Sequence, residues 1–294
     1  MIRTFRHDDR TLDELLAAKD GEVTAVLPAL NEAITIGGIV SALKQLGGLV
    51  DQILVIDGSS TDGTADRARE AGAEVYDESE LMPEFGPARG KGDAMWRALS
   101  VARGEYIIYL DADTLDFNLR FPIGLIGAIL GRPDVQLVKG AFARPFVTPE
   151  GERPNEGGRV TELCARPLLA AFHPPLAQFV QPLAGEIAAR RDLLERIPFP
   201  ADFGVEIGML IDVYHEVGID AMVQVDLGER RNQHQPLFEL GRMAYKVQGA
   251  VLRRLREAGV LQIEELPPYT GPDGRVLELT PVERPPFQTV RSTA

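Results

Sequence analysis

The sequence predicts an α/β fold with a mostly parallel sheet that is flanked by helices. Two largely apolar runs, 52–56 (QILVI) and 106–110 (YIIYL), have the length and composition of strands. Strands that are apolar on both faces are typical of parallel sheets with helices on either side. Segments with helical spacing separate these runs, and such a strand–helix alternation indicates a parallel sheet.

The first half of the chain contains the clearer elements. Apolar strands are predicted over residues 23–29, 52–56, 73–76 and 106–110. Helices are predicted between them, over residues 32–46 and 65–71 and through Trp96 and Leu99. The first of these helices rests on apolar side chains that recur near one face.

The second half of the chain is less regular. Strands are predicted over residues 135–140 and 221–226, and helices over residues 159–171, 204–217 and 237–258. Beyond Gly259 the chain is rich in proline, and we expect a tail that is weakly ordered or packed onto the domain.

The composition narrows the class of protein. Among 294 residues, 31 are Lys or Arg and 44 are Asp or Glu, which gives a formal net charge of −13. This balance disfavours nucleic acids and anionic membranes as partners, because both attract clustered positive charge. The single cysteine, Cys164, excludes a disulfide within the chain. No apolar run approaches the ~20 residues of a membrane span, and the N-terminus lacks a signal peptide's apolar core. We therefore expect a cytoplasmic protein.

Four polar clusters fall where ligands bind in an open α/β sheet, beyond the carboxyl ends of the strands. Three of them follow predicted strands and one lies in a Gly-rich loop; they cover residues 31–32, 57–60, 89–92 and 111–113. Their convergence on one edge is more informative than any single cluster.

Asp111 and Asp113 form a D-x-D pattern directly after a buried strand. Carboxylates at i and i+2 can face one hard divalent cation, and Mg²⁺ or Mn²⁺ would complete its shell with phosphate oxygens. A metal there would neutralise a diphosphate leaving group. The alternative is an acidic, solvated turn that caps the next helix, and the pattern alone favours it. The position after residues 106–110, together with the other clusters, favours the metal site.

Lys91 lies between two glycines. Glycines allow the backbone to approach a ligand closely, and the ammonium can then meet phosphate. The surrounding sequence, residues 86–92 (GPARGKG), lacks the spacing and the Ser or Thr of a Walker A loop. A flexible loop without a ligand remains the alternative.

Eight motifs occur in the order found in one enzyme family. They are PALNE (28–32), DGSSTDGT (57–64), GKG (90–92), DAD (111–113), GGRVTEL (157–163), QPLAGE (181–186), FGVEIG (203–208) and VDLG (225–228). From about residue 20 to 255, the chain therefore resembles the retaining glucosyl-3-phosphoglycerate and mannosyl-3-phosphoglycerate synthases, which are nucleotide-sugar glycosyltransferases of the GT-A type.

The resemblance implies a GT-A domain with two functional halves. Residues 21–140 would bind the nucleotide sugar and residues 141–258 the acceptor. Outside the range of the resemblance, we expect residues 1–20 to form a helical N-terminal extension and residues 259–294 to form the Pro-rich tail. The resemblance also implies a homodimer, for which the long predicted helix is the candidate surface.

The resemblance assigns roles to individual residues. The donor-binding set is Pro28, Ala29, Leu30, Asn31, Glu32, Asp57, Gly58, Lys91, Asp111, Ala112 and Arg230. The set near the reacting sugar or the metal is Lys91, Asp113, the Leu183 backbone carbonyl and Glu206. The acceptor-binding set is Gly158, Arg159, Val160, Thr161, Asn232 and His234.

Two departures from the family pattern bear on the site. Gly58 stands where much of the family has Ser, so one donor-side hydroxyl is missing. The family's third metal ligand is a His two residues after an Arg, whereas here Asn232 stands two residues after Arg230 and His234 follows. Imidazole is the better transition-metal ligand, which favours His234 over Asn232 as the partner of Asp113.

The implied activity is transfer of glucose or mannose from a nucleoside-diphosphate sugar to the 2-hydroxyl of 3-phospho-D-glycerate, with retention. We favour front-face attack over double displacement, for which Glu206 is the only nucleophile we would name. UDP-glucose, GDP-glucose and GDP-mannose all remain candidate donors. The alternatives are an inverting GT-A transferase with another acceptor and a non-catalytic nucleotide-sugar-binding protein.

Overall fold

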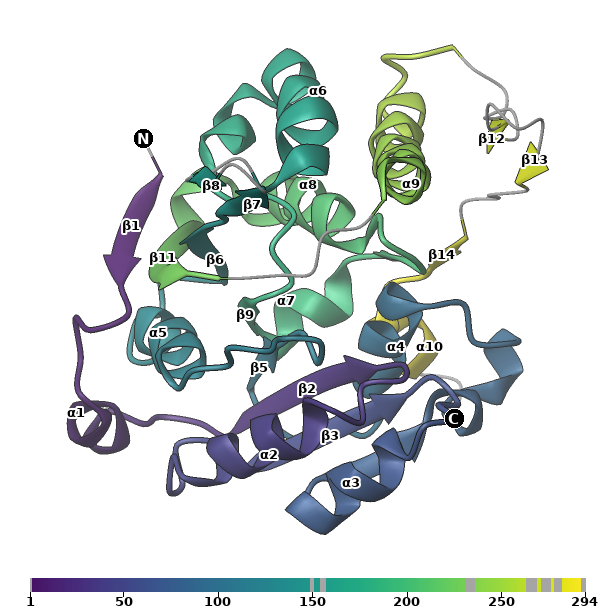
Figure 1. Cartoon of the computed structure of the whole chain (residues 1–294). Coiled ribbons are helices and arrows are strands. Elements are labelled where there is room, and N and C mark those ends of the chain that lie inside the picture. Colours follow the sequence, from purple (N-terminus) through teal and green to yellow (C-terminus); the bar gives the residue numbers. More distant parts are fainter. Residues whose placement is uncertain are drawn as a thin grey trace.

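The computed structural model describes residues 2–148, 151–153, 157–230, 236–262, 269–270, 276–277 and 282–291 (Figure 1). Its central sheet has eight strands in the order β1-β11-β6-β9-β5-β2-β3-β4. Their bounds are β1 (Arg3–Arg6), β2 (Val23–Ala29), β3 (Gln52–Asp57), β4 (Glu74–Asp77), β5 (Tyr106–Tyr109), β6 (Leu137–Ala143), β9 (Ile187–Arg190) and β11 (Met222–Glu229). Every neighbouring pair is parallel except the two that involve β9, which confirms the mostly parallel sheet of a GT-A fold.

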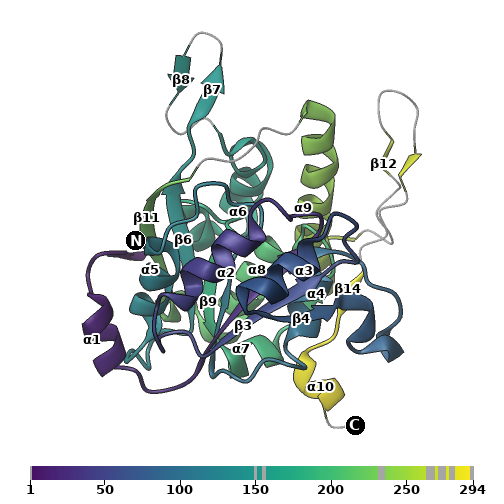
Figure 2. The same ribbon diagram turned by 60° about the horizontal axis from the view of Figure 1, so that its bottom comes forward.

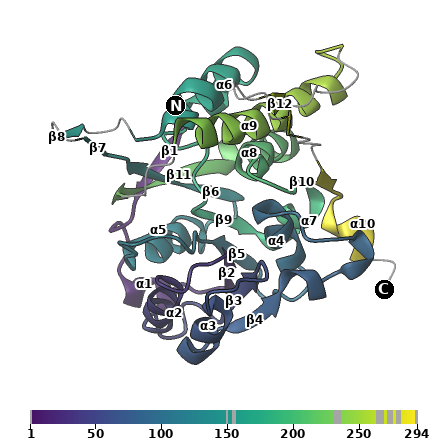
Figure 3. The same ribbon diagram turned by 45° about the vertical axis from the view of Figure 1, so that its right-hand side comes forward.

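Helices cover both faces of this sheet (Figure 3). Side chains of β2 alternate between two apolar cores, because successive residues of a strand point to opposite faces. One core includes residues of α1 (Leu12–Ala17), α2 (Ile36–Lys44), α3 (Thr64–Ala71) and α5 (Arg120–Ile129). The other includes residues of α4 (Lys91–Ala98), α6 (Arg166–Phe172), α7 (Arg191–Arg196), α8 (Val205–Val217), α9 (Leu237–Glu257) and α10 (Phe287–Arg291).

The remaining elements are short. Paired strands are β7 (Phe146–Thr148) with β8 (Gly151–Arg153), β10 (Phe199–Pro200) with β14 (Glu283–Arg284), and β12 (Tyr269–Thr270) with β13 (Val276–Leu277). Short helical turns are η1 (Glu78–Glu80), η2 (Pro83–Phe85), η3 (Thr161–Ala165), η4 (Pro174–Gln178) and η5 (Ile219–Ala221). Figure 2 shows β7 and β8 projecting away from the sheet.

Three sequence-based expectations differ from the structure. The N-terminal residues are not only helical, because β1 pairs with β11 and extends the sheet by one strand. The helix expected over residues 159–171 is present from residue 159 to Phe172, but it is not α-helical throughout, because it contains the π-helical turn Thr161–Ala165. The helix expected over 32–46 is shorter, Ile36–Lys44, because residues before it form a loop bound to the chain after β3.

No helix in the described ranges is both long and apolar enough to cross a membrane. Residues 282–291 of the Pro-rich tail pack against the domain, which is one of the two outcomes expected for the tail.

Candidate active site

One edge of the sheet collects the polar motifs. β2, β3, β5, β6 and β11 are parallel, so all of them end there. β9 runs in the opposite direction, so it begins at the same edge, and the turn before it, residues 181–186, lies there too. This topology brings Asp57, Asp111, Gly185 and Arg230 together from distant parts of the chain.

The loops after β2 and β3 are bound to each other. The Asn31 backbone N–H donates to Ser60 Oγ at 2.8 Å, and the Thr61 N–H donates to Asn31 Oδ1 at 3.0 Å. The Glu32 N–H donates to Thr64 Oγ1 at 2.8 Å. Asn31 has a φ of 58°, a left-handed conformation that asparagine tolerates better than most residues. These contacts place the predicted donor-binding residues 28–32 and 57–58 beside one another.

Asp57 is buried and retains an unused acceptor. Its Oδ2 accepts the Ser60 N–H at 3.0 Å, whereas Oδ1 is buried and has no hydrogen-bond partner within the described part of the chain. An unsatisfied buried acceptor costs about 1–3 kcal/mol, which a ligand N–H would recover. A Cβ at the neighbouring Gly58 would contact Leu30 at an ordinary 3.5 Å, so glycine is not sterically required there.

Lys91 begins α4 and lies between two carboxylates. Its Nζ donates to Asp111 Oδ1 at 2.5 Å and to Glu206 Oε1 at 2.7 Å. Burial alone would lower the pKa of Lys91, but the two carboxylates raise it well above its usual range. A Cβ at Gly185 would collide with Asp111 Oδ1 and Lys91 Nζ, so the turn before β9 lies directly against this ion pair.

Arg230 forms ion pairs with both aspartates of the D-x-D pattern. Its side chain is fully buried. It donates to Asp111 Oδ2 at 2.8 Å and to Asp113 Oδ1 at 3.1 Å, and also to Glu186 Oε1. Lys91 and Arg230 together overcome the effect of burial and hold the pKa of Asp111 well below its usual range. The guanidinium therefore fixes both aspartates, and its predicted contact with the donor stays a prediction.

The open side of this cluster is acidic. Asp113 is exposed, and Ala112 is fixed beneath it because its carbonyl accepts the Thr35 hydroxyl at 2.6 Å. Burial, followed by the charges of Asp113, Asp62 and Asp111, raises the pKa of Glu32 to about 7. Carboxylate oxygens that repel one another in this way fit a hard divalent cation, which needs only one or two of them beside phosphate oxygens and water.

The described residues contain no group of three or more Asp, Glu, His or Cys that could hold a metal. Asn232 and His234 lie outside the described residues.

The predicted acceptor segment borders the same turn. Gly158 and Thr161 are buried where η3 begins, and Arg159 and Val160 are half-buried. Gln181 donates through Nε2 to the Phe142 carbonyl at 3.1 Å. Its Oε1 is buried, has no partner in the described ranges, and lies 3.7 Å from where a Cβ of Gly158 would be. Leu183 is half-buried in the turn between Gln181 and Gly185.

Sequence reasoning missed two charged residues of the site. Glu186 is buried beside Arg230, and its Oε2 has no partner among the residues described. Lys139, on β6, is buried and donates to the Ala184 carbonyl in the turn before β9. Burial lowers the pKa of Lys139 to about 8. The available signal for Lys139 was a lone cation in an otherwise apolar strand.

Comparisons with known proteins show which proteins this chain is similar to. Residues 24–121 match the family described as Glycosyl transferase family 2. The glucosyl-3-phosphoglycerate synthase of Mycolicibacterium smegmatis is 42% identical over 285 residues, which cover 96% of this chain and 94% of that protein. The enzyme of the same name from Petrotoga mobilis is 38% identical over 305 residues, covering 98% and 94%.

Two solved structures are similar over nearly their whole length. Mannosyl-3-phosphoglycerate synthase from Rubrobacter xylanophilus has a TM-score of 0.88 and 46% identity, covering 98% of this chain and 97% of that one. Glucosyl-3-phosphoglycerate synthase from Mycobacterium tuberculosis, in complex with Mn²⁺, UDP-glucose and phosphoglyceric acid, has a TM-score of 0.87 and 39% identity, covering 99% of both chains.

Proposed function

The chain belongs to the family of glucosyl-3-phosphoglycerate and mannosyl-3-phosphoglycerate synthases and is a hexosyltransferase; we propose that it transfers glucose or mannose from a nucleoside-diphosphate sugar to the 2-hydroxyl of 3-phospho-D-glycerate, with retention at the anomeric carbon. The observation that carries the proposal is the Lys91 ion pair with Asp111 and Glu206, set at the sheet edge where the donor loops and the acceptor segment meet. Related enzymes bind UDP-glucose and phosphoglyceric acid with Mn²⁺, and UDP with Mg²⁺.

The donor would lie across the ends of β2, β3 and β5. The unused Asp57 Oδ1 can accept an N–H from the base, and the Lys91 ammonium can meet the diphosphate. Asp113, with Asp111 behind it, would hold Mg²⁺ or Mn²⁺. When bound, the ion supplies Lewis-acid stabilisation of the leaving diphosphate.

The acceptor would lie between η3 and the turn before β9. Gly158, Arg159, Val160 and Thr161 would contact the phosphate and carboxylate of 3-phosphoglycerate, because backbone N–H groups and a guanidinium suit such anions. The buried Gln181 Oε1 beside Gly158 adds an acceptor for a hydroxyl. Asn232 and His234 stay predicted members of this region.

Retention is best explained by front-face attack. The bond from the anomeric carbon to the diphosphate oxygen breaks while the bond to the acceptor 2-oxygen forms, and the departing diphosphate takes the hydroxyl proton. Glu206 is already hydrogen-bonded to Lys91, which makes it a poor free nucleophile for double displacement. The products are a nucleoside diphosphate and the glycosyl-3-phosphoglycerate.

The test is a donor panel of UDP-glucose, GDP-glucose and GDP-mannose, each with 3-phosphoglycerate and Mg²⁺. Nucleotide release that depends on the acceptor, with an α-linked product by NMR, supports the proposal. A β-linked product would indicate an inverting enzyme, and donor binding without transfer would indicate a binding protein. A homodimer is also proposed, and light scattering after gel filtration measures it directly.

A further inference from the structure

The C-terminal segment, residues 282–291, returns to the body of the domain. Its strand β14 pairs antiparallel with β10, and the Ala201 N–H donates to the Val282 carbonyl at 2.9 Å. Trp96 Nε1 donates to the Pro285 carbonyl at 2.8 Å. Phe287 is buried edge-on against Trp96, with 5.6 Å between ring centroids. The segment therefore packs behind α4 through Arg284 and Phe287, which are buried, while its last turn is partly exposed.

Arg284 is the charged centre of this contact. Only 5% of it is exposed, and it makes a bidentate ion pair with Asp93, in which both hydrogen bonds measure 2.6 Å. It also donates to the carbonyls of Phe85 and Pro87, in the loop that leads to Lys91. Asp93 lies two residues after Lys91 in the first turn of α4. One guanidinium thus fixes the chain on both sides of Lys91.

A second arginine completes the enclosure of Asp93. Arg97 Nε donates to Asp93 Oδ1 at 3.0 Å, and its Nη2 donates to the Gly86 carbonyl at 2.7 Å. Asp93 and Arg97 have no exposed surface. The loop before Lys91 is therefore held through three successive carbonyls, at residues 85, 86 and 87.

The same segment supports the partner of Lys91. β10 leads through residues 201–204 into α8, which carries Glu206 in its first turn. The Asp93 N–H donates to the Ala201 carbonyl at 3.0 Å, and a Cβ at Gly92 would collide with the Pro200 carbonyl. β10 therefore contacts both the C-terminal segment and the first turn of α4, and it leads directly to the helix that carries Glu206.

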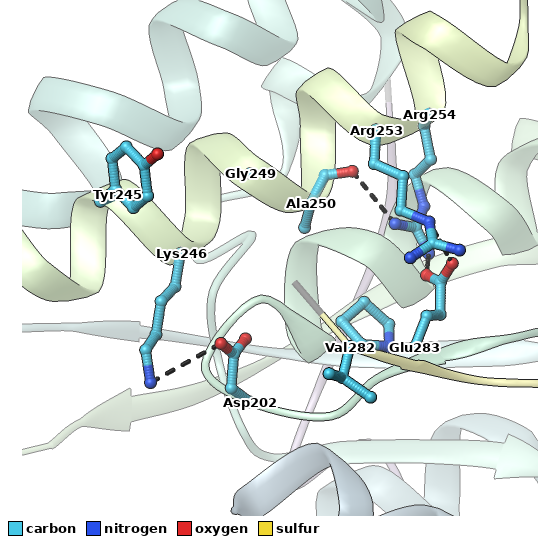
Figure 4. A pocket seen from close by; sticks show the side chains of 10 residues that line it. Asp202, Tyr245, Lys246, Gly249, Ala250, Arg253, Arg254, Val282 and Glu283 are labelled. Atoms are coloured by element: carbon cyan, nitrogen blue, oxygen red, sulfur yellow. Dashed lines mark hydrogen bonds and ion pairs between the residues drawn. The ribbon is translucent and has the colours of Figure 1, made fainter. Parts of the chain in front are cut away.

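The other side of the segment is bound to α9. Figure 4 shows Arg253 and Arg254 of α9 pointing toward Glu283, and each ion pair measures 2.8 Å. The shallow pocket beside these residues encloses about as much space as one water molecule occupies, so we assign it no ligand.

We propose that the C-terminal segment helps to fix the geometry of the active site. Arg284 is the positioning residue, and it acts through Asp93 to place Lys91 against Asp111 and Glu206. The proposal rests on the proposed role of Lys91 at the donor diphosphate. Arg284 is buried against Asp93 and is not hydrogen-bonded to Lys91, Asp111 or Glu206, so its effect would pass through the geometry of α4.

The test compares full-length Arg284→Met with Arg291→Met, a matched control. Arg291 lies in the same segment but pairs at the surface with Glu195, at 3.1 Å. Because a displacement of ~1 Å can cost about 100-fold in rate, we expect Arg284→Met to lower kcat/KM for the donor by roughly 10- to 100-fold. The KM for 3-phosphoglycerate should change by less than about twofold, since the acceptor segment is separate from α4. Arg291→Met should match the wild type.

Two further variants keep the outcome interpretable. Arg284→Lys retains the buried charge without the bidentate geometry, so it should fold and recover part of the activity. The double variant Lys91→Met/Arg284→Met should lose no more than Lys91→Met alone, because residues that act through one another are not additive. Multiplicative losses, or wild-type donor kinetics in a folded Arg284→Met, overturn the proposal. Inactivity of the wild type on every donor would instead refute the proposed function.

Discussion

The buried charges of this site lie in shared ion pairs. Lys91 pairs with Asp111 and Glu206, and Arg230 pairs with Asp111 and Glu186. Removing one member of a buried ion pair commonly costs about 3–5 kcal/mol, because the remaining charge has no compensation. Substitutions that keep the shape and alter only one charge are therefore the informative ones.

Glu206→Gln separates the two mechanisms of retention. If Glu206 only positions Lys91, the amide oxygen can still accept the Lys91 hydrogen bond, and we expect kcat to fall by roughly 10- to 100-fold. If Glu206 is the nucleophile, turnover should be abolished. Steady-state kinetics measures the loss, and intact-protein mass spectrometry should find no glycosyl adduct on the wild-type enzyme.

Glu78 should make stability depend on pH. Burial, followed by the charge of Asp93, raises the pKa of Glu78 to about 7 in the folded protein, whereas Arg97 acts in the opposite direction. The folded state therefore binds more protons than the unfolded state between the two pKa values, so stability falls as pH rises through that range. Replacing the carboxylate with Gln removes this effect.

The measurement is urea unfolding at about pH 5 and about pH 8. Relative to Glu78→Gln, the wild type should lose roughly 2 kcal/mol more on going to the higher pH. Glu80→Gln, an exposed neighbour in the same turn, is the control and should show no such difference. Parallel pH curves for the wild type and Glu78→Gln would contradict the assignment.

The elements differ in how clearly the sequence indicates them. β2, β3 and β5 are buried on both faces, so their continuous apolar composition predicted them. β9 was missed because its four residues, Ile187–Arg190, are short and rich in alanine. It exists because it pairs with β5 on one side and β6 on the other, and such long-range pairing leaves no local pattern.

The residues of the site also divide into those that the sequence predicted and those that it missed. Motif residues that end predicted strands, such as Asp57 and Asp111, lie where the α/β topology required. Lys139 was missed because its partner is a backbone carbonyl, which no side-chain pattern reveals. Arg284 was missed because it lies in a Pro-rich tail, 191 residues from Asp93.

The turn before β9 supplies the prediction at the scale of elements. Because a Cβ at Gly185 would collide with Asp111 and Lys91, Gly185→Ala should displace the ion pair. We expect the free energy of unfolding to fall by about 1–3 kcal/mol, as for other overpacked interiors. We also expect kcat to fall by more than this loss of stability alone would cause. The control is Gly38→Ala in α2, where the new Cβ would meet nothing within 4 Å. That variant should gain up to about 1 kcal/mol by chemical unfolding, and equal effects of the two substitutions would contradict the placement of the turn.

At the scale of the whole molecule, the net charge of −13 opposes both proposed substrates, which are anions. Positive charge at the site must therefore overcome the repulsion between the acidic protein and these anions. Lys91 and Arg230 each form ion pairs with carboxylates, so these two cations by themselves overcome only part of the field. A divalent ion at Asp113 would add the missing positive charge at the point where the diphosphate lies.

Removing the metal should therefore weaken donor binding as well as turnover. We expect EDTA to raise the Kd of the preferred donor at least about tenfold, measured by calorimetry without acceptor. Asp113→Asn is the matched variant, because Asp113 is exposed and its substitution leaves Asp111 and Arg230 paired. The affinity of this variant for the donor should already be low, and its Kd should change little when EDTA is added. An unchanged donor affinity for the wild type in EDTA would mean that the protein's own cations overcome the field, and the metal would then serve the chemical step alone.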